Sequence, residues 1–226
     1  NTIFPIESNG LLKTNFNLNL QNNTLLNLKN AENDLEALAD SSFNITCLRF
    51  ATACGFSPRL RLDLVLNDFV ASAVTKGKIE ILSDGTPWRP LIHVKDMARA
   101  IDWAINRTSN NGGDFLAVNA GSNDWNYQIR ELAEGVKKVL PDVDIDINES
   151  AAPDKRSYKV DFSLFNHFAP DFRPIVSLKD AVKGLVAGLE EIKFSDTNFR
   201  ESQLLRLNIL RDHLNSNRLN DNLEWI

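Results

Sequence analysis

An arginine, Arg89, stands where an apolar run meets a helical pattern, and it is the first candidate for chemistry in this sequence. Leu91 and Ile92 supply the apolar run of a strand, and from Met97 onward apolar residues recur at helical spacing. Asp96 stands at the expected start of the helix, where a carboxylate is favourable. A guanidinium held at such a strand–helix junction can bind a phosphate through two charge-assisted hydrogen bonds. The alternative is an arginine in a surface ion pair.

A second candidate is the pair Arg156 and Tyr158. Residues two apart on an extended segment project to the same side, so a guanidinium and a phenol would face one ligand there. The competing account is a surface salt bridge from Arg156 to Asp154 or Asp161. Together with Arg89, the pair predicts a site for a single anionic ligand.

Four blocks of sequence, in this order, resemble the extended short-chain dehydrogenase/reductase family, in particular its NAD-dependent nucleotide-sugar epimerases and dehydratases. The blocks are Ile45–Gly55, Leu62–Phe69, Arg89–Asp96 and Asp154–Asp161. Their order and spacing carry the resemblance, which covers residues 29–161, and the tail Leu204–Trp225 is similar to the closing helices of one branch of the family. The resemblance implies an α/β, Rossmann-type fold, a nucleotide-sugar substrate and NAD or NADP as cofactor.

The family's catalytic pair is a tyrosine four residues before a lysine, and this chain departs from it. The best match to the lysine is Lys29, followed by Ala31 and Glu32 as in the family, and Leu25 occupies the tyrosine position. In the family the lysine lowers the tyrosine pKa and binds the nicotinamide ribose. Leucine has no proton to exchange, so the chain by itself is expected to be inactive. Lys29 either keeps the ribose role or is a solvated lysine on a helix.

The resemblance also assigns ligand-binding roles along the chain. Phe50 would lie beside the nicotinamide or pack in the core, and Thr52 would lie near the sugar. Asn67 would donate its amide to the diphosphate or be a polar position on an apolar helix face. His93, inside an apolar strand without a nucleophile or carboxylate motif, is expected to be structural. The expected substrate-binding set is Thr52, Asn67, Arg89, Arg156 and Tyr158.

The family's glycine-rich dinucleotide turn is missing, because nothing in residues 1–44 supplies it. The chain begins with Asn1, and its only methionine is Met97. We therefore expect that the N-terminal glycine-rich half is missing from this chain and that NAD or NADP binding is impaired. The expected organisation is an irregular segment over residues 1–23, a remnant of the dinucleotide-binding domain over 24–56, and a mostly substrate-binding domain with returning Rossmann elements over 57–226.

The composition of the chain indicates which kinds of partner the protein is expected to bind. A net charge of -5 over 226 residues gives no footprint of a nucleic-acid surface, although Arg59, Arg61, Arg89 and Arg156 could form a local basic pocket. No run approaches the roughly 18 apolar residues of a membrane span. The cysteines Cys47 and Cys54 match no zinc spacing and are expected to be free thiols in a reducing compartment, the cytoplasm. A homodimer is a further possibility.

Apolar periodicity predicts alternating strands and helices, which indicates an α/β class. The expected helices cover residues 24–40, 62–74, 97–107, 129–140, 178–189 and 199–214, and Pro58 is placed at the start of the second. The expected strands cover residues 45–50, 78–82, 91–94, 115–118 and 143–147, and Trp225 is an expected anchor.

Three functions follow from these patterns. The first is NAD(P)-dependent epimerisation or dehydration of a nucleotide sugar, an isomerase-type activity in which this chain supplies the substrate-binding part. The second is a non-catalytic member of the family that acts as a binding or assembly module, as Leu25 and the missing glycine turn suggest. The third is an atypical reductase on a substrate without a nucleotide, because fold does not fix chemistry.

Overall fold

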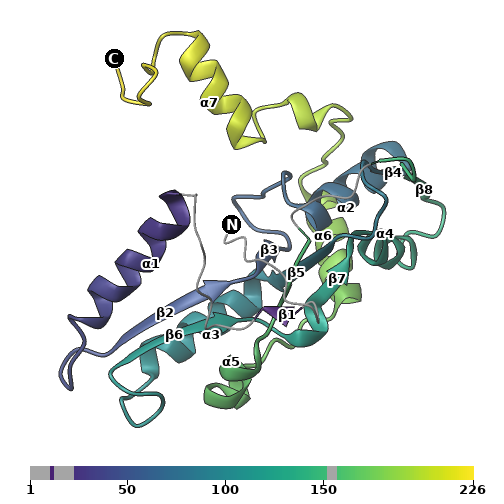
Figure 1. Cartoon of the computed structure of the whole chain (residues 1–226). Coiled ribbons are helices and arrows are strands. Elements are labelled where there is room, and N and C mark those ends of the chain that lie inside the picture. The colour runs from purple at the N-terminus through teal and green to yellow at the C-terminus, as the bar shows by residue number, and fades with distance from the viewer. Residues whose placement is uncertain (1–10, 13–22, 152–156) are drawn as a thin grey trace. The chain divides into compact units, whose positions relative to one another are not determined.

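The computed structural model describes residues 11–12, 23–151 and 157–226, with side chains from Leu28 onward. The chain divides into two compact units, each assembled from separate stretches of sequence (Figure 1). The first unit contains residues 1–53, 82–131 and 147–177, and the second contains residues 54–81, 132–146 and 178–226. Each unit is described by itself.

The first unit is built on a parallel pair of strands, β2 (Ile45–Phe50) and β6 (Phe115–Ala120). Their register is continuous, from Ile45 opposite Phe115 to Phe50 opposite Ala120. Two helices pack on this pair, α3 (Val94–Asn106) and α5 (Ser163–Phe168), and α1 (Asn23–Glu36) contacts the same two strands. A parallel pair covered by helices is the expected α/β arrangement, so the predicted fold class is confirmed.

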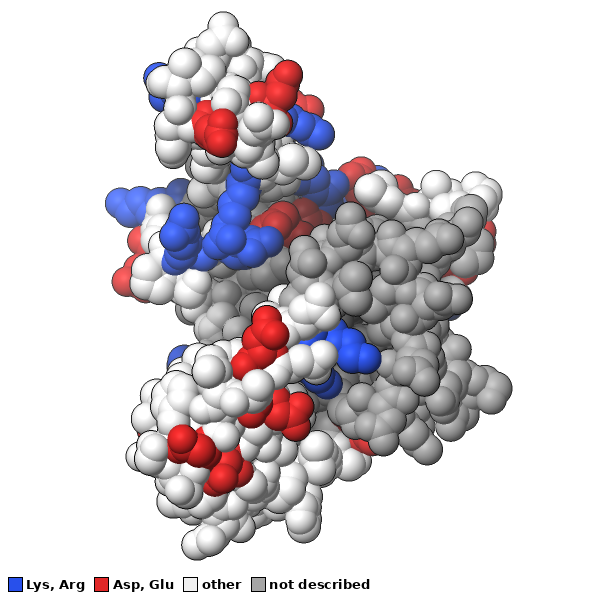
Figure 2. Space-filling view, turned by 60° about the vertical axis from the view of Figure 1, so that its left-hand side comes forward, with Lys and Arg blue, Asp and Glu red and all other residues white. Residues whose placement is uncertain are grey.

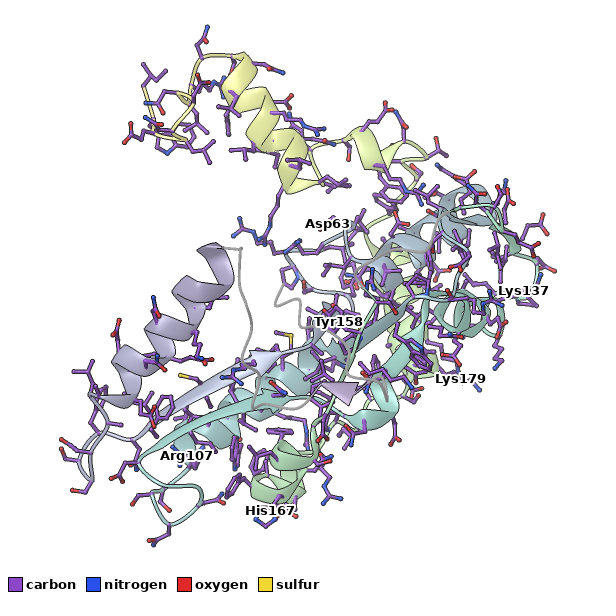
Figure 3. All side chains as sticks on the ribbon, in the orientation of Figure 1. Asp63, Arg107, Lys137, Tyr158, His167 and Lys179 are labelled. Atoms are coloured by element: carbon purple, nitrogen blue, oxygen red, sulfur yellow. The ribbon has the colours of Figure 1, made fainter. Side chains whose placement is uncertain are left out.

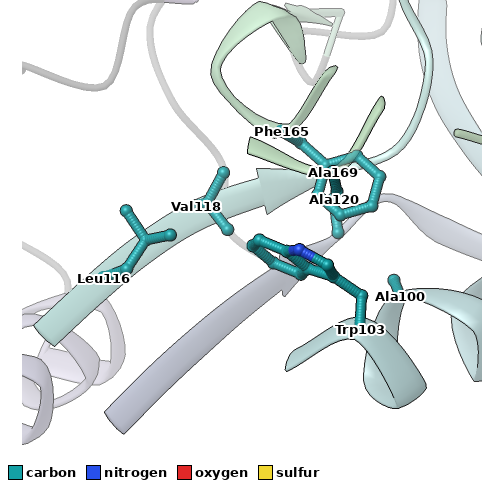
Figure 4. Close-up of a cluster of buried hydrophobic side chains, with 7 residues drawn as sticks. All are labelled: Ala100, Trp103, Leu116, Val118, Ala120, Phe165 and Ala169. Carbon is teal, nitrogen blue, oxygen red and sulfur yellow. The ribbon is translucent and has the colours of Figure 1, made fainter. Parts of the chain in front are cut away.

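The core of this unit is an aromatic cluster between β6, α3 and α5 (Figure 4). Trp103 and Phe165 meet edge to face, with ring centroids 5.4 Å apart at an interplanar angle of 89°. This geometry aligns the positive edge of one ring with the negative face of the other. The remaining buried members of the cluster are Ala100, Leu116, Val118, Ala120 and Ala169.

Two smaller strand sets complete the described part of the first unit. One has the order β3 (Thr52–Cys54), β5 (Trp88–His93), β7 (Asn126–Gln128), and β5 and β7 run antiparallel. The other pairs β1 (Leu11–Leu12) with β9 (Lys159–Val160) in parallel. Short 3-10 turns occur at Asn123–Trp125 (η1) and Pro170–Phe172 (η2). β3 follows β2 after a single residue, so the end of β2 is next to the β3–β5–β7 sheet.

The second unit is based on α2 (Val65–Lys76), which packs against α6 (Leu178–Glu191) and β4 (Lys78–Ile81). β4 pairs with β8 (Asp144–Ile147), and α4 (Ile129–Lys137) leads into this unit from the first. Gly188 makes room for Phe56, because a Cβ there would lie 2.2 Å from a ring carbon. The tail contains η3 (Phe199–Glu201) and α7 (Arg206–Asn215), and no residue of α7 is buried.

Most predicted elements are present, with four corrections. No helix begins at Pro58, because residues 58–64 form turns and α2 begins only at Val65. The predicted helix over residues 199–214 is broken, since η3 and α7 are separate. β1, β3 and β7 lie where no strand was expected. Trp225 is no buried anchor, because it is 73% exposed and contacts the His213 ring.

Within the described ranges, none of the helices combines the length and hydropathy that crossing a membrane requires. The same ranges hold no group of three or more His, Cys, Asp or Glu side chains arranged to bind a metal ion.

Candidate functional site

Arg89 lies on β5 in the first unit, as the strand–helix pattern predicts. Its Nη1 donates a hydrogen bond of 2.8 Å to the carbonyl of Trp88, which ties the guanidinium to its own strand. The next residue, Pro90, is buried, as are Leu91 and Ile92. The half-buried guanidinium therefore stands on a rigid apolar frame.

Tyr158 lies in the same unit (Figure 3). Its surroundings include Arg89 and Thr52. Its ring packs with Ala51 against the buried Val160 and Phe162. Burial raises the pKa of the phenol above its usual value of 10.0, and this outweighs the lowering by the Arg89 charge and by a hydrogen bond with the Thr52 side chain. The phenol is thus protonated at neutral pH and able to donate a hydrogen bond.

Three of the predicted ligand-binding residues, Thr52, Arg89 and Tyr158, therefore come together in one unit. Arg156, the fourth, lies outside the described residues. A cationic guanidinium, a neutral phenol and a hydroxyl together match the oxygen atoms of a phosphate or diphosphate, which accept hydrogen bonds and carry negative charge.

The residues predicted for the cofactor lie around β2 in the same unit. Lys29 is exposed on α1. The backbone of Leu25 is part of α1, and its side chain lies outside the described set. Phe50 ends β2 and packs, partly buried, against the aromatic cluster of Trp103 and Phe165.

An ion pair that the sequence patterns did not reveal joins α1 to β2. Arg49 Nε donates to Glu32 Oε1 at 2.8 Å, and Arg49 Nη2 lies 2.5 Å from Glu32 Oε2. The pairing raises the pKa of Arg49, with the Glu32 hydrogen bond as the main cause. A charged residue inside the apolar run Ile45–Phe50 was the available signal, and the pair holds the helix that carries Lys29.

Asn67 lies on α2 in the second unit, where its amide is used by the preceding loop. Its Oδ1 accepts a hydrogen bond of 3.0 Å from the Gly55 amide, and its Nδ2 donates one of 2.9 Å to the Arg61 carbonyl. The residue is 2% exposed. Gly55 itself has φ 108°, a conformation that favours glycine. Asn67 thus shapes residues 55–61, whatever further role it has.

Basic side chains gather next to α7 in the second unit (Figure 2). Arg61 is paired with Asp63, and the hydrogen bond from Arg61 lowers the pKa of that carboxyl. Arg206 also acts on Asp63 by its charge. Arg59, another member of the predicted basic pocket, is exposed.

His93 and Asp96 have structural partners in the first unit. His93 caps α3, because its Nδ1 accepts a hydrogen bond from the Lys95 amide at 3.2 Å. Asp96 lies in the first turn of α3, but its carboxylate accepts from the amides of Ile175 and Val176 at 3.1 and 3.2 Å. The expectation of a structural histidine agrees with this geometry.

Comparison with known proteins finds similarity to one family over part of the chain. Residues 30–121 match the family described as "NAD dependent epimerase/dehydratase family". The chain is 27% identical over 135 residues to UDP-glucuronic acid decarboxylase 1 of Arabidopsis thaliana, a match that covers 58% of this chain and 29% of that enzyme. The resemblance predicted from the sequence is thereby confirmed.

Solved structures show the same fold. UDP-N-acetylglucosamine 4-epimerase from Methanobrevibacter ruminantium M1, in complex with UDP-N-acetylmuramic acid, has a TM-score of 0.62 at 20% identity, over 82% of this chain and 60% of its own. UDP-glucose-4-epimerase from Stenotrophomonas maltophila, with bound NAD and formylated UDP-arabinopyranose, has a TM-score of 0.58 at 17% identity, over 75% and 54%. The chain spans little more than half the length of these structures.

Proposed function

From the match of residues 30–121 to the NAD dependent epimerase/dehydratase family, we propose that this chain supplies the substrate-binding part of an enzyme that epimerises or dehydrates a nucleotide sugar with NAD or NADP. The observation that carries the proposal is the joining of Arg89, Tyr158 and Thr52 in one unit. The plant relative and the two solved relatives are all named for a UDP-sugar activity, which supports a nucleotide diphosphate as the ligand.

The roles follow from the chemistry of each side chain. Arg89 would bind diphosphate oxygens with its charge and its planar set of donors. Tyr158 would donate one hydrogen bond from its protonated phenol, whose oxygen is already in contact with Thr52. Arg156 would add a second cation from the same segment, and Asn67 would hold the loop that it bonds.

The residues of this chain do not fit the diphosphate of a dinucleotide. None of its ten glycines forms the G-x-G-x-x-G turn, and the one adjacent pair, Gly112 and Gly113, lies in the turn between α3 and β6, not between a strand and a helix. NAD would supply hydride exchange when bound. The contribution expected from this chain is limited to the nicotinamide end, with Phe50 beside the ring and Lys29 at the ribose.

A second function, a binding or assembly module without catalysis, is favoured by one observation. Leu25 stands where the family has its proton-transferring tyrosine, and the glycine turn is absent from the sequence. Both functions require a nucleotide diphosphate to bind. They differ in turnover with NAD or NADP, which the whole enzyme should show and the module should not; this chain by itself is expected to show none in either case.

Calorimetric titration with UDP-, GDP-, CDP- and dTDP-sugars tests the shared claim. Arg89→Met should weaken binding of the preferred ligand by about 10- to 100-fold, because a charge-assisted hydrogen bond contributes about 1.5–3 kcal/mol. Arg130→Met is the matched control: it removes the same charge from an exposed arginine that bonds the Asp84 carbonyl. Equal affinities for the two variants, or no binding to any member of the panel, would contradict the proposal.

A further inference from the structure

The segment that carries Tyr158, residues 157–163, is held mainly by side chains. In the described structure only Lys159 and Val160 belong to a strand, β9. At its beginning, the Trp88 amide donates to Ser157 Oγ at 3.0 Å, and the Tyr158 amide donates to the Trp88 carbonyl at 3.3 Å. Lys159 Nζ lies 3.6 Å from the centre of the Trp88 ring. The main chain beside Arg89 is thus joined to the main chain of Tyr158.

Asn126, on β7, bonds the main chain of Val160 in the segment 157–163, as a neighbouring strand would. Its Oδ1 accepts a hydrogen bond of 2.9 Å from the Val160 amide, and its Nδ2 donates one of 3.0 Å to the Val160 carbonyl. Nδ2 also donates to the Asn123 carbonyl at 3.0 Å, which fixes the rotamer. One carboxamide therefore satisfies both polar main-chain groups of Val160.

Asn123 makes a similar side-chain contact with the main chain of Phe162, two residues after Val160. Its Oδ1 accepts a hydrogen bond of 2.9 Å from the Phe162 amide. In an extended segment, amides two residues apart point to the same side, so Asn123 and Asn126 together take the place of a neighbouring strand. Val160 and Phe162 are buried at the same time, and a residue added or lost in this segment would expose them.

This register determines where the phenol lies. Side chains two apart on an extended segment share a face, and Tyr158 packs in one cluster with Val160 and Phe162. From these contacts we propose that Asn126 is a positioning residue: through Val160 it holds the Tyr158 phenol against Thr52 and beside Arg89, in place to meet the diphosphate of the ligand. The proposal rests on the proposed function for the ligand, but the placement of the phenol can be tested without one.

The chain offers a direct probe, because it has only two tyrosines, Tyr127 and Tyr158. In a Tyr127→Phe background, the ultraviolet absorbance of tyrosinate reports on Tyr158 alone. Asn126→Ala in this background should bring the pKa of Tyr158 back toward 10.0, since a displaced phenol gains water. The same variant should bind UDP about three- to tenfold more weakly, the change expected from loss of one well-placed hydrogen bond.

Two further variants separate positioning from general destabilisation. Asn106→Ala removes an exposed asparagine that also bonds main chain, through Nδ2 to the Asp102 carbonyl at 2.8 Å, and it should leave both the pKa and the UDP affinity unchanged. If Asn126→Ala does not fold, Asn126→Ser keeps a small polar side chain and adds no charge, so it should give smaller shifts in the same direction.

The outcomes are distinct. A folded Asn126 variant with the Tyr158 pKa of the Tyr127→Phe parent overturns the proposal, whatever its affinity. A lowered pKa with unchanged UDP affinity overturns the link between phenol placement and the ligand. If the parent binds neither UDP nor any nucleotide sugar of the panel, the proposed function fails, and the pKa measurement still decides whether Asn126 positions Tyr158.

Discussion

Two regions of the first unit, the β2–β6 pair and the segment 157–163, are held in place by different means. The β2–β6 pair has a continuous parallel register over six residues and is covered by the aromatic cluster of Trp103 and Phe165. The segment 157–163 has two residues in a strand, and the carboxamides of Asn123 and Asn126 bond the main chain of Val160 and Phe162. The first region depends on main-chain pairing and burial, whereas the second adds particular side chains to the short pairing of β9 with β1 and to the burial of Val160 and Phe162.

The difference has a consequence for function. A strand pair keeps its main-chain hydrogen bonds when one side chain is changed, so a substitution there mostly alters packing and stability. A segment held by two carboxamides can shift when one of them is lost, while the core remains intact. We expect substitutions around β6 to change the free energy of unfolding, and substitutions around Asn126 to change the environment of Tyr158.

The largest effect should come from Trp103→Ala, in the core beside β6. The indole is 5% exposed and meets Phe165 edge to face, so the variant should lose about 3–5 kcal/mol of unfolding free energy. Urea denaturation measures the loss. Ile105→Ala, on the same helix and 77% exposed, is the control and should change stability by less than about 0.5 kcal/mol. Equal losses would show that the cluster is not the core of this unit.

The two regions also differ in how far the sequence predicts them. The apolar run Ile45–Phe50 and the helical spacing after Met97 predicted β2 and α3, because burial on a regular element leaves a periodic pattern. Nothing periodic marks Asn123 or Asn126, whose partners lie more than thirty residues away. Such contacts depend on the tertiary structure alone, so the residue pattern predicted a role for Tyr158 but not the side chains that place it.

Arg107→Met should have the next largest effect, because it removes the side chain that hydrogen-bonds the first residues of β2 and the turn before β6 (Figure 3). The guanidinium is 6% exposed and bonds Thr46 Oγ1 and the carbonyls of Ile45, Asn111 and Gly113. Loss of a buried cation that leaves several acceptors unsatisfied should cost about 2–4 kcal/mol in urea denaturation. Arg130→Met, at an exposed position, should cost less than about 0.5 kcal/mol. A neutral Arg107→Met variant would mean that water replaces the guanidinium at those acceptors.

Gly121→Ala tests whether the two regions are coupled. A Cβ at Gly121, just after β6, would lie 2.5 Å from a ring carbon of Phe162, which is fully buried. The ring has to move, so we expect a loss of about 1–3 kcal/mol and a changed Tyr158 pKa, since both aromatic rings share one cluster. Gly184→Ala, where a Cβ meets nothing within 4 Å, should be neutral or slightly stabilising. A destabilised Gly121→Ala protein with an unchanged phenol would show that the segment moves independently of β6.

The candidate site was predicted in its residue types more than in its contacts. Arg89 was assigned from the strand–helix junction, and it lies on β5 as that pattern requires. The pattern could not show that Asn67 bonds Gly55 and Arg61, because these contacts depend on the path of the loop before α2. The Arg49–Glu32 pair was missed for a similar reason, since residues 17 apart in sequence meet only after α1 packs on β2.

The smallest expected effect concerns His93, at the end of β5, and it depends on pH. Burial lowers the pKa of its imidazole below 6.5, although Asp96 acts in the opposite direction. The folded state therefore favours the neutral ring, whose Nδ1 accepts from the Lys95 amide. The unfolded chain binds a proton first as the pH falls, so this contribution is present above pH 6.5 and is lost as the pH falls through the folded pKa.

Replacing His93 by Asn keeps a helix-capping side chain and removes the titration. The loss of stability between about pH 7.5 and about pH 5 should be smaller in His93→Asn than in the parent, by up to about 1 kcal/mol, as measured by urea denaturation at each pH. Asn106→Ala, at an exposed position on α3, removes no titratable group; it is the control and should keep the parent's slope. If the slopes of parent and His93→Asn coincide, protonation of His93 does not change the stability of the junction that carries Arg89.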